Sequence, residues 1–329
     1  DIIKCGSYTG NGSSGVTIDL GFEPQWLLIK RTNAVQNWNI YDNMRGLTAG
    51  PDSPSLIPNL NSAEGGGTEV FHFKTRTANE PHFKSDFDRV DFALYKSAIS
   101  GTGDLYAAPR LISNKVLITN STSAQIDGGT GFVMDFSWKT ENTANRRLKH
   151  NLGVAPEMVW VKNRATENWY VYQSDLGSNI QLTLNTYDDV VTTSALWPSP
   201  SATEFGIREN AIWNTGTSLV GFFFATLAGI SKVGSFTGNG SSQTIDCGFT
   251  SGSRFILIKR TNANGNWVFF DSLRGIITGN SPSLFLNDTE GQRTSEDIID
   301  PASSGFIVNQ ETQQNLNVNG SNYIFYAIA

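Results

Sequence analysis

Three short stretches of the chain are apolar at every position, at residues 26–29, 158–161 and 255–258. Successive side chains of a strand point to opposite faces, so an unbroken apolar run predicts a strand buried on both faces, in the middle of a packed sheet. An Asn-Trp pair follows each run, and after the first pair residues 38–41 alternate between apolar and polar, which predicts the next strand. No amphipathic helix of useful length is readable, so the pattern predicts an all-β chain.

Whole phrases recur along the chain. The phrase Gly-Ser-x-Thr-Gly-Asn-Gly-Ser-Ser stands at residues 6–14 and again at 234–242, and a more divergent copy of the pattern begins at Phe132. Apolar strands at 219–225 and 323–329 close two of the copies. A repeat of about 100 residues has the size of a whole β-sandwich and is too large for a solenoid unit. We therefore predict repeats at 1–98, 131–229 and 230–329, with a linker or arm at 99–130.

The predicted fold is three tandem, lectin-like antiparallel β-sandwich (jelly-roll-like) repeats, arranged in series as a rod. The joint at 225–231 is very short, which favours fixed neighbours over freely swinging ones. The Gly-Asn-Gly turn signals at 10–12 and 238–240 predict β-hairpins between their flanking strands.

Composition agrees with a turn-rich β protein. Charged residues make up 16% of the chain, against roughly 25% in an average soluble domain, and Gly, Asn, Ser and Thr take their place. The net charge of −6 offers no general attraction to nucleic acid. No apolar run approaches the roughly 18 residues that span a bilayer, so we expect no membrane insertion. Cys5 and Cys247 occupy different positions in their repeats, which predicts two free thiols.

Candidate chemistry is sparse. His72 and His82 share one irregular segment with Glu80, a weak zinc-site signal that no other repeat carries. The carboxylates at 188–189 and 297–300 are not repeated either. Calcium could bind the loop at 287–290, but the helix–loop–helix pattern is absent and a solvated loop is favoured. We therefore predict no catalytic residue, no cofactor and no metal, and we expect that the protein is not an enzyme.

The Asn-Trp pairs contain Trp38, Trp169 and Trp267. One interpretation is a lectin-like platform in which tryptophan stacks on a pyranose ring. The other is that tryptophan fills the core while asparagine turns the chain into the strand. Recurrence in every repeat, directly after a doubly buried strand, favours the core.

Charged residues recur at the ends of the apolar runs. Lysines at 30, 162 and 259 close these runs, and we predict strand-end charges that face solvent or pair locally. Asp42 with Arg45, and Asp271 with Arg274, share one spacing before a glycine. They predict local ion pairs that order a turn, each contributing under about 1 kcal/mol if exposed.

Several phrases together resemble repeat domains in structural proteins of tailed phages, especially marine and cyanobacterial ones. They are the Gly-Asn-Gly phrase above, Gly-Val-Ala-Pro-Glu-Met-Val-Trp-Val-Lys-Asn-Arg at 153–164, Ile-Lys-Arg-Thr-Asn-x-x-x-Asn-Trp at 29–38 and 258–267, Ser-Pro-Ser-Leu at 53–56 and 281–284, and Tyr-Ile-Phe-Tyr-Ala-Ile-Ala at 323–329. The resemblance covers all three repeats and is weakest at 99–130. It implies a tail fibre or adhesin-like protein on the virion surface, commonly a trimer, with no catalytic motif to carry over.

The expected function is thus a non-enzymatic virion protein that contacts other virion subunits and a bacterial surface glycan or protein. Receptor choice would lie in loops that differ between repeats, at 48–67, 192–205 and 278–297. The individual candidates for ligand binding are Asn59, Trp197, Asn287 and Asp288. The alternatives are a purely structural fibre-shaft or capsid-decoration module, a polysaccharide-cleaving enzyme, and a secreted carbohydrate-binding lectin.

Overall fold

The computed structural model describes residues 5–10, 12, 18–20, 26–42, 54–65, 116–120, 123–126, 134–139, 145–149, 152–193, 196–208, 218–309 and 314–329. This part of the chain is nearly all β, with strands β1 to β20 and one short 3-10 helix, η1 (Ser174–Leu176). The strand pairs are antiparallel, so the all-β prediction is confirmed. None of the helical structure described is long and apolar enough to cross a membrane.

Two large sheets share one order of strands. The first runs β10 (Val191–Thr192), β9 (Ile180–Thr183), β8 (Trp169–Gln173), β7 (Met158–Asn163), β12 (Ser218–Phe224) and β5 (Met134–Lys139). The second runs β17 (Leu284–Phe285), β16 (Trp267–Asp271), β15 (Phe255–Arg260), β20 (Asn322–Ile328) and β13 (Ser231–Thr237). In both sheets, the apolar strand that closes the copy lies between the doubly apolar strand and the strand that opens the copy.

Smaller sheets accompany the large ones. They are β6 (Asn145–Lys149) with β11 (Glu204–Arg208); β14 (Gln243–Asp246), β19 (Gly305–Val308) and β18 (Ile299–Ala302); β1 (Trp26–Ile29) with β2 (Asn39–Asp42); and β3 (Val116–Asn120) with β4 (Ser123–Ile126). One hydrophobic cluster joins the three-stranded sheet to the five-stranded one, with Phe306 of β19 edge-on to Phe325 of β20 at 5.5 Å between ring centroids. This packing is sandwich-like.

The doubly apolar runs of β7 and β15 are buried on both faces, as their sequence predicts, whereas the run in β1 is only half-buried. In β7, Met158 and Trp160 belong to one hydrophobic core, whereas Val159 and Val161 belong to another. In β15, Leu257 faces the same core as Trp160, while its neighbours on either side face the cluster shared with the small sheet. Alternation along the strand divides the apolar residues between two cores, which is why no polar face interrupts the run.

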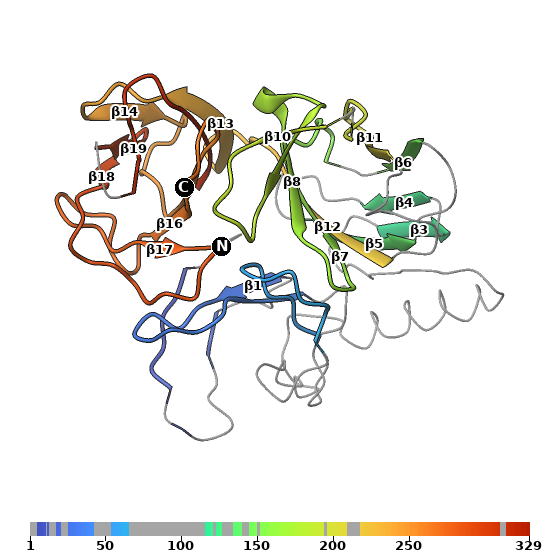
Figure 1. Ribbon diagram of the computed structural model, residues 1–329, viewed down its shortest axis with the longest axis horizontal. Helices are drawn as coiled ribbons and strands as arrows, with labels where there is room; N and C mark the ends of the chain where they lie inside the picture. Colours follow the sequence, from blue (N-terminus) through green and yellow to red (C-terminus); the bar gives the residue numbers. More distant parts are fainter. Residues whose placement is uncertain are drawn as a thin grey trace.

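One core is shared by distant parts of the chain, and we call it the central core. It draws on a first segment (described residues within 5–65), a second segment (within 116–229) and a third segment (within 230–329). The members shared by all three are the tryptophans of the Asn-Trp pairs and a leucine from each segment: Trp38, Trp169, Trp267, Leu56, Leu182 and Leu284. In Figure 1 the second segment (green to yellow) and the third (orange to red) lie side by side, with β1 below and between them.

The three segments are joined in a closed cycle of hydrogen bonds. The indole N–H of Trp169, in the second segment, donates to Ile57 O of the first at 3.1 Å. Trp267 of the third donates in the same way to Thr183 O of the second at 3.0 Å, and Trp38 of the first donates to Phe285 O of the third at 2.7 Å. Main-chain bonds repeat the cycle beside each indole: Gln36 N to Thr289 O, Glu167 N to Asn61 O, Gly265 N to Tyr187 O, Gln292 N to Thr32 O, Glu64 N to Arg164 O and Val190 N to Thr261 O.

Two expectations about shape are therefore wrong. In a rod the first and third segments would not touch, yet Trp38 and Gln36 bond to the third segment directly. The Gly-Asn-Gly turn at 238–240 does not close a hairpin, because β13 pairs with β20 while β14 pairs with β19 in another sheet. The turn crosses between sheets because Gly238 lies against the loop at 317–321, where an added Cβ would stand 2.3 Å from Val318 O. The copy at 10–12 lies largely outside the described residues.

Candidate functional site

Pairs of asparagines hold the three central tryptophans in place. Asn59 Oδ1 accepts a hydrogen bond from Trp38 N at 2.9 Å, and its Nδ2 donates to Asn37 Oδ1 at 2.9 Å. The same two bonds recur in the other segments, from Trp169 N to Asn185 and on to Asn168, and from Trp267 N to Asn287 and on to Asn266. Because both ends of each amide are used, these asparagines serve to fix the tryptophans.

Lysines at the ends of the doubly buried strands lie at the three joins between segments. Lys162 is 0% exposed, and its Nζ donates to the main-chain carbonyls of Asn163, Ala165 and Glu167 at 2.6–2.8 Å. Lys259 is also 0% exposed, and its Nζ bonds to Gly265 O of its own segment and Tyr187 O of the second. Of the two predicted alternatives, exposure to solvent is wrong for both lysines, while Lys162 does bond locally, to carbonyl oxygens and not to a carboxylate. Each ammonium group replaces water with carbonyl oxygens.

Burial also shifts the titration of these lysines. It lowers the pKa of Lys162 to about 8, against the attraction of Glu167 and Glu64, which raises it. It lowers the pKa of Lys259 to about 8 as well, against Asp188 and Asp189. Lys30, the half-buried member of the set, bonds to Gln36 O and Thr289 O, and burial lowers its pKa too. Lys259 and Lys30 thus bond across joins between segments, whereas the three hydrogen bonds of Lys162 lie within the second segment.

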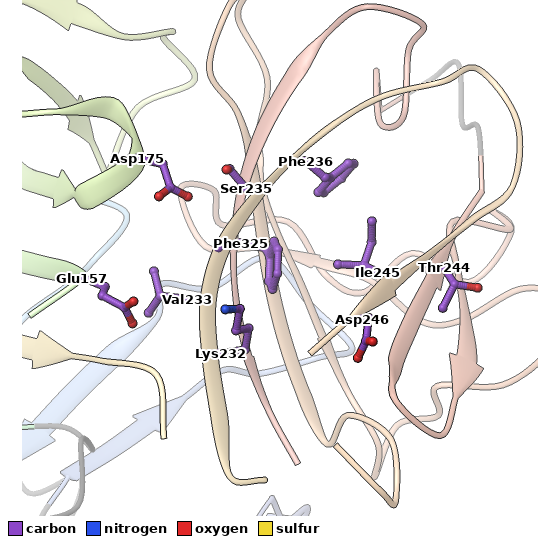
Figure 2. A pocket seen from close by; sticks show the side chains of 11 residues that line it. Glu157, Asp175, Lys232, Val233, Ser235, Phe236, Thr244, Ile245, Asp246 and Phe325 are labelled. Atoms are coloured by element: carbon purple, nitrogen blue, oxygen red, sulfur yellow. The ribbon is translucent and has the colours of Figure 1, made fainter. Parts of the chain in front are cut away.

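A groove of about 410 Å³ lies where the second segment meets the third (Figure 2). Glu157, just before β7, and Asp175, in η1, come from the second segment. Residues 232–236 of β13 and 244–246 of β14 come from the third, together with Phe325. Figure 2 shows Lys232 between the two acidic side chains of the second segment and Asp246 of the third. This groove is the candidate binding site of the described residues.

The walls of the groove are tied together at Thr226. Glu157 Oε2 accepts a hydrogen bond from Thr226 N at 2.5 Å, and Thr226 Oγ1 in turn accepts one from Val233 N at 3.2 Å. The other two carboxylates are held locally, because Asp175 accepts from the Gln173 side chain and Asp246 from a neighbouring main-chain N–H. Each carboxylate therefore has one oxygen fixed by the protein, and within the described residues the other oxygen receives no hydrogen bond.

The floor of the groove depends on a glycine. Gly234 of β13 pairs with Phe325 of β20, and an added Cβ at 234 would stand 2.8 Å from the Phe325 ring. The ring therefore lies directly over the glycine backbone. Phe236, two residues further along β13, is partly buried and stacks on Tyr323 with 4.9 Å between centroids. The result is a polar groove with aromatic side chains along one part of its wall.

The join between the third and first segments has the same backbone but different chemistry. Arg254 lies just before β15, at the position that Glu157 has before β7. In both cases the main-chain N–H donates to a carbonyl at the end of the closing strand, and the main-chain carbonyl accepts from the N–H of the serine that follows the next strand. Leu273 follows that serine, where the second segment has Asp175. Cys5 Sγ lies 3.6 Å from Arg254 O, and burial, followed by repulsion from Asp271, raises the pKa of this thiol to about 11. The fold therefore does not require the acidic pair of the groove.

The sequence model of a family described as Domain of unknown function (DUF7483) matches residues 3–82 and 113–329. The chain belongs to the DUF7483 family. The stretch that the DUF7483 model leaves unmatched, 83–112, overlaps the predicted arm at 99–130 and the end of the predicted first repeat. No curated protein matches the chain, and no solved structure matches it. The family description states no function, so the function of this DUF7483 chain has to be argued from its own residues.

Of the predicted ligand-binding residues of the DUF7483 chain, Asn59 and Trp197 are buried, and Asn287 and Asp288 are half-buried. Asn59 is 5% exposed and Asn287 is its counterpart in the third segment, both with amides occupied as described above. Trp197 is 0% exposed in the core of the second segment, with its indole N–H donating to Ile180 O at 3.1 Å. Asp288 Oδ1 accepts from the main-chain N–H groups that follow it, which forms a local turn. Their side chains are committed to internal contacts.

The other predicted structural residues are placed as follows. Trp38, Trp169 and Trp267 are 2% exposed or less, which confirms the core interpretation, although the core is the central one. The Asp271–Arg274 ion pair is confirmed, with 2.5 Å between Oδ2 and Nε, and Asp271 Oδ1 also caps the turn. Asp42 is 1% exposed, while its predicted partner Arg45 lies outside the described residues, as do the three histidines. Both cysteines are free thiols.

The sequence held one signal that the prediction missed. Each tryptophan is braced by the asparagine of a Leu-x-(Leu/Pro)-Asn phrase, at 56–59, 182–185 and 284–287, and this recurrence identifies Asn185 beside the other two. The groove residues Glu157, Asp175 and Lys232 had no such signal, because they are distant in sequence and the two acidic residues are not repeated. Within the described residues, no cluster of three or more His, Cys, Asp or Glu side chains has the geometry to hold a metal ion.

Proposed function

We propose that this protein is a non-enzymatic component of a tailed-phage virion, built from three tandem, lectin-like β-sandwich repeats that close into a ring. In this proposal it belongs to a tail fibre or similar appendage, contacts other virion subunits, and presents one part of its surface to a glycan or protein of the bacterial host. The phrases shared with phage structural proteins are the reason for placing it on the virion surface.

The observation that carries the proposal is the cyclic set of joins. Each of the three tryptophans donates to a carbonyl of another segment, and Lys259 and Lys30 do the same. The asparagine braces and Lys162 hold the residues beside each join from within their own segments. Such extensive use of polar side chains for assembly is typical of a rigid scaffold. A rigid scaffold with variable loops suits a protein that holds a binding surface at a fixed orientation on a particle.

Sandwich-like packing supports the lectin-like part of the proposal. The five-stranded sheet has one face on the central core and the other on the small sheet of β14, β19 and β18. Each repeat would then be a two-layered unit whose inner layer meets its counterparts at the centre. The trimer predicted from the resemblance stays a prediction. The internal cycle supplies threefold-like contacts, but these contacts lie within one chain.

The test is adsorption. Fluorescently labelled protein is incubated with a panel of marine bacteria that includes cyanobacteria, with heat-unfolded protein as the control. We expect saturable binding to at least one strain and competition with phage infection of that strain. Saturable binding to none, or binding that leaves infection unchanged, would remove the receptor role.

A second candidate, a purely structural shaft or decoration module, is favoured by one observation. Asn59, Trp197 and Asn287 are committed to internal contacts and are withdrawn from ligand binding. Cryo-electron microscopy of particles labelled with an antibody to this chain separates the two candidates. Density at a free tip supports host contact, whereas density enclosed by other subunits supports the structural module.

A further inference from the structure

We propose that the groove between the second and third segments binds a non-acidic pyranose sugar, such as a hexose or an N-acetylhexosamine. This inference rests on the proposed function, because it names the part of a host glycan that the protein would recognise. The site consists of Glu157 and Asp175 on one side, Lys232 in the middle, and Asp246 with Phe236 on the other side (Figure 2).

The size of the groove suits a small ligand. Its volume of about 410 Å³ lies within the roughly 300–1,000 Å³ of typical small-molecule sites. It is formed by main chain and short side chains of two strands, β13 and β14, facing the carboxylates of the second segment. Thr226 bridges Glu157 and Val233, so the two sides are held at a fixed separation. A ligand would therefore enter a largely preformed site.

The hydrogen-bonding groups match sugar hydroxyls. Each of the three carboxylates has one oxygen already held by the protein, and the second oxygen can accept from a ligand O–H. The ammonium group of Lys232 makes no hydrogen bond to the described residues, so it can donate to a ring or hydroxyl oxygen. A sugar hydroxyl both donates and accepts, so neighbouring hydroxyls on one ring can satisfy a carboxylate and the ammonium group together.

Charge selects against acidic sugars. The three carboxylates outnumber the single ammonium group, so the site carries an excess of acidic groups. A sialic or uronic acid would bring another carboxylate into this field and be repelled. An uncharged sugar meets no such repulsion, and Phe236 offers an apolar edge for the C–H face of its ring.

The chain itself shows that the groove chemistry is separable from folding. At the join of the third segment with the first, the positions of Glu157 and Asp175 are taken by Arg254 and Leu273, yet the backbone hydrogen bonds are the same. Carboxylates gathered around a lysine in a preformed groove, at positions that hold Arg254 and Leu273 at another join, indicate a binding role.

The test uses the full chain and saturation-transfer NMR with a panel of sugars. We expect transfer to methyl hexosides and N-acetylhexosamine oligomers, and none to sialyllactose or oligogalacturonate. Asp175→Asn and Asp246→Asn should each weaken binding about tenfold, the value of one charge-assisted hydrogen bond. The matched control is Asp19→Asn, which changes the same Thr-Ile-Asp phrase in the first segment, away from the groove, and should leave sugar binding unchanged.

Several outcomes overturn the inference. They are no transfer to any non-acidic sugar, stronger binding of acidic sugars, equal loss in the Asp19→Asn control, and capture of a lysine-rich peptide in place of sugars. Cell adsorption separates this inference from the proposed function. Groove variants that still adsorb like the wild type would refute the groove and leave the receptor role intact, whereas sugar binding without adsorption to any cell would do the reverse.

Discussion

The indole N–H of Trp38 donates to the carbonyl of Phe285 at 2.7 Å, joining residues 247 positions apart and closing the cycle between the first and third segments. Replacing Trp38 with phenylalanine removes this donor and leaves the Phe285 carbonyl with the longer bond from Asp288 N at 3.3 Å. We expect Trp38→Phe to destabilise the protein by about 2–4 kcal/mol, from the lost bond together with the lost volume. Urea denaturation followed by tryptophan fluorescence and circular dichroism measures the change.

Trp160 provides the matched control for that substitution. It lies in the same central core and is 1% exposed, but its Nε1 has no hydrogen-bond partner among the described residues. Trp160→Phe therefore loses side-chain volume but no hydrogen bond, and we expect it to destabilise the protein less than Trp38→Phe does. Equal losses in the two variants would mean that the indole bonds contribute nothing to closing the cycle.

Gly234 and Gly6 occupy the same place in the repeated phrase, but we expect their substitution by alanine to affect stability differently. An added methyl group at 234 would meet the Phe325 ring at 2.8 Å, whereas none of the described residues lies within 4 Å of a methyl group at 6. We expect Gly234→Ala to destabilise by about 1–3 kcal/mol, typical of overpacking, and Gly6→Ala to change stability by under about 0.5 kcal/mol. Thermal denaturation of the two variants side by side checks this, and a harmless Gly234→Ala would show that Phe325 can move aside.

The buried lysines should respond to substitution in a graded way. Lys162→Met keeps the apolar stem but withdraws the donor from three carbonyl oxygens. We expect a loss of about 2–4 kcal/mol, because three partly buried carbonyl oxygens lose a charged donor at once. Lys30→Met should be milder, since Lys30 is half-buried and water can reach its carbonyl partners. A larger loss at Lys30 than at Lys162 would contradict this account.

We expect the thiol of Cys247 to make the free energy of unfolding depend on pH in the alkaline range. Burial raises the pKa of its thiol from 9.0 to about 12, so above pH 9 the unfolded chain releases a proton that the folded chain keeps. The stability linked to this thiol is present below pH 9 and is lost as the pH rises, by about 1.4 kcal/mol per pH unit. Cys247→Ala removes this loss.

The measurement for Cys247 is urea denaturation under reducing conditions at neutral pH and at about pH 10 to 11. The packing change of Cys247→Ala appears equally at both pH values and therefore cancels. We expect the free energy of unfolding of the variant, relative to that of the wild type, to be larger at the higher pH than at neutral pH. A stability difference that does not change with pH would show that the thiol titrates alike in folded and unfolded chains.

The sequence predicted most of the local structure. Unbroken apolar runs identified β7 and β15, and the recurrence of Trp38, Trp169 and Trp267 identified them as core. Both signals work because alternation and burial leave a direct trace in residue type along a strand. The Asp271–Arg274 pair was found for a similar reason, since its partners are only three residues apart.

What the sequence did not indicate was the relation between the segments. A lysine that ends a strand reads as a solvated charge, and only the fold brings Lys259 beside Tyr187 O, 72 positions earlier. The groove was missed for the same reason, because Glu157 and Lys232 meet only when the second segment packs on the third. Hairpin turns were over-predicted because glycine marks both a tight turn and a close approach of backbones, and at Gly238 the second reason applies.

Closure at Trp38 and Phe285 also limits how such a chain can evolve. A linear array can gain or lose a unit at either end, provided that the new terminal unit has a polar outer face. In this chain every segment has a neighbour on both sides, so no segment is terminal and none needs a cap. An added fourth unit would have to open the central core, and a lost one would expose apolar surface on the remaining two. The number of units is thus fixed by geometry, and variation is confined to the residues that face outward at each join.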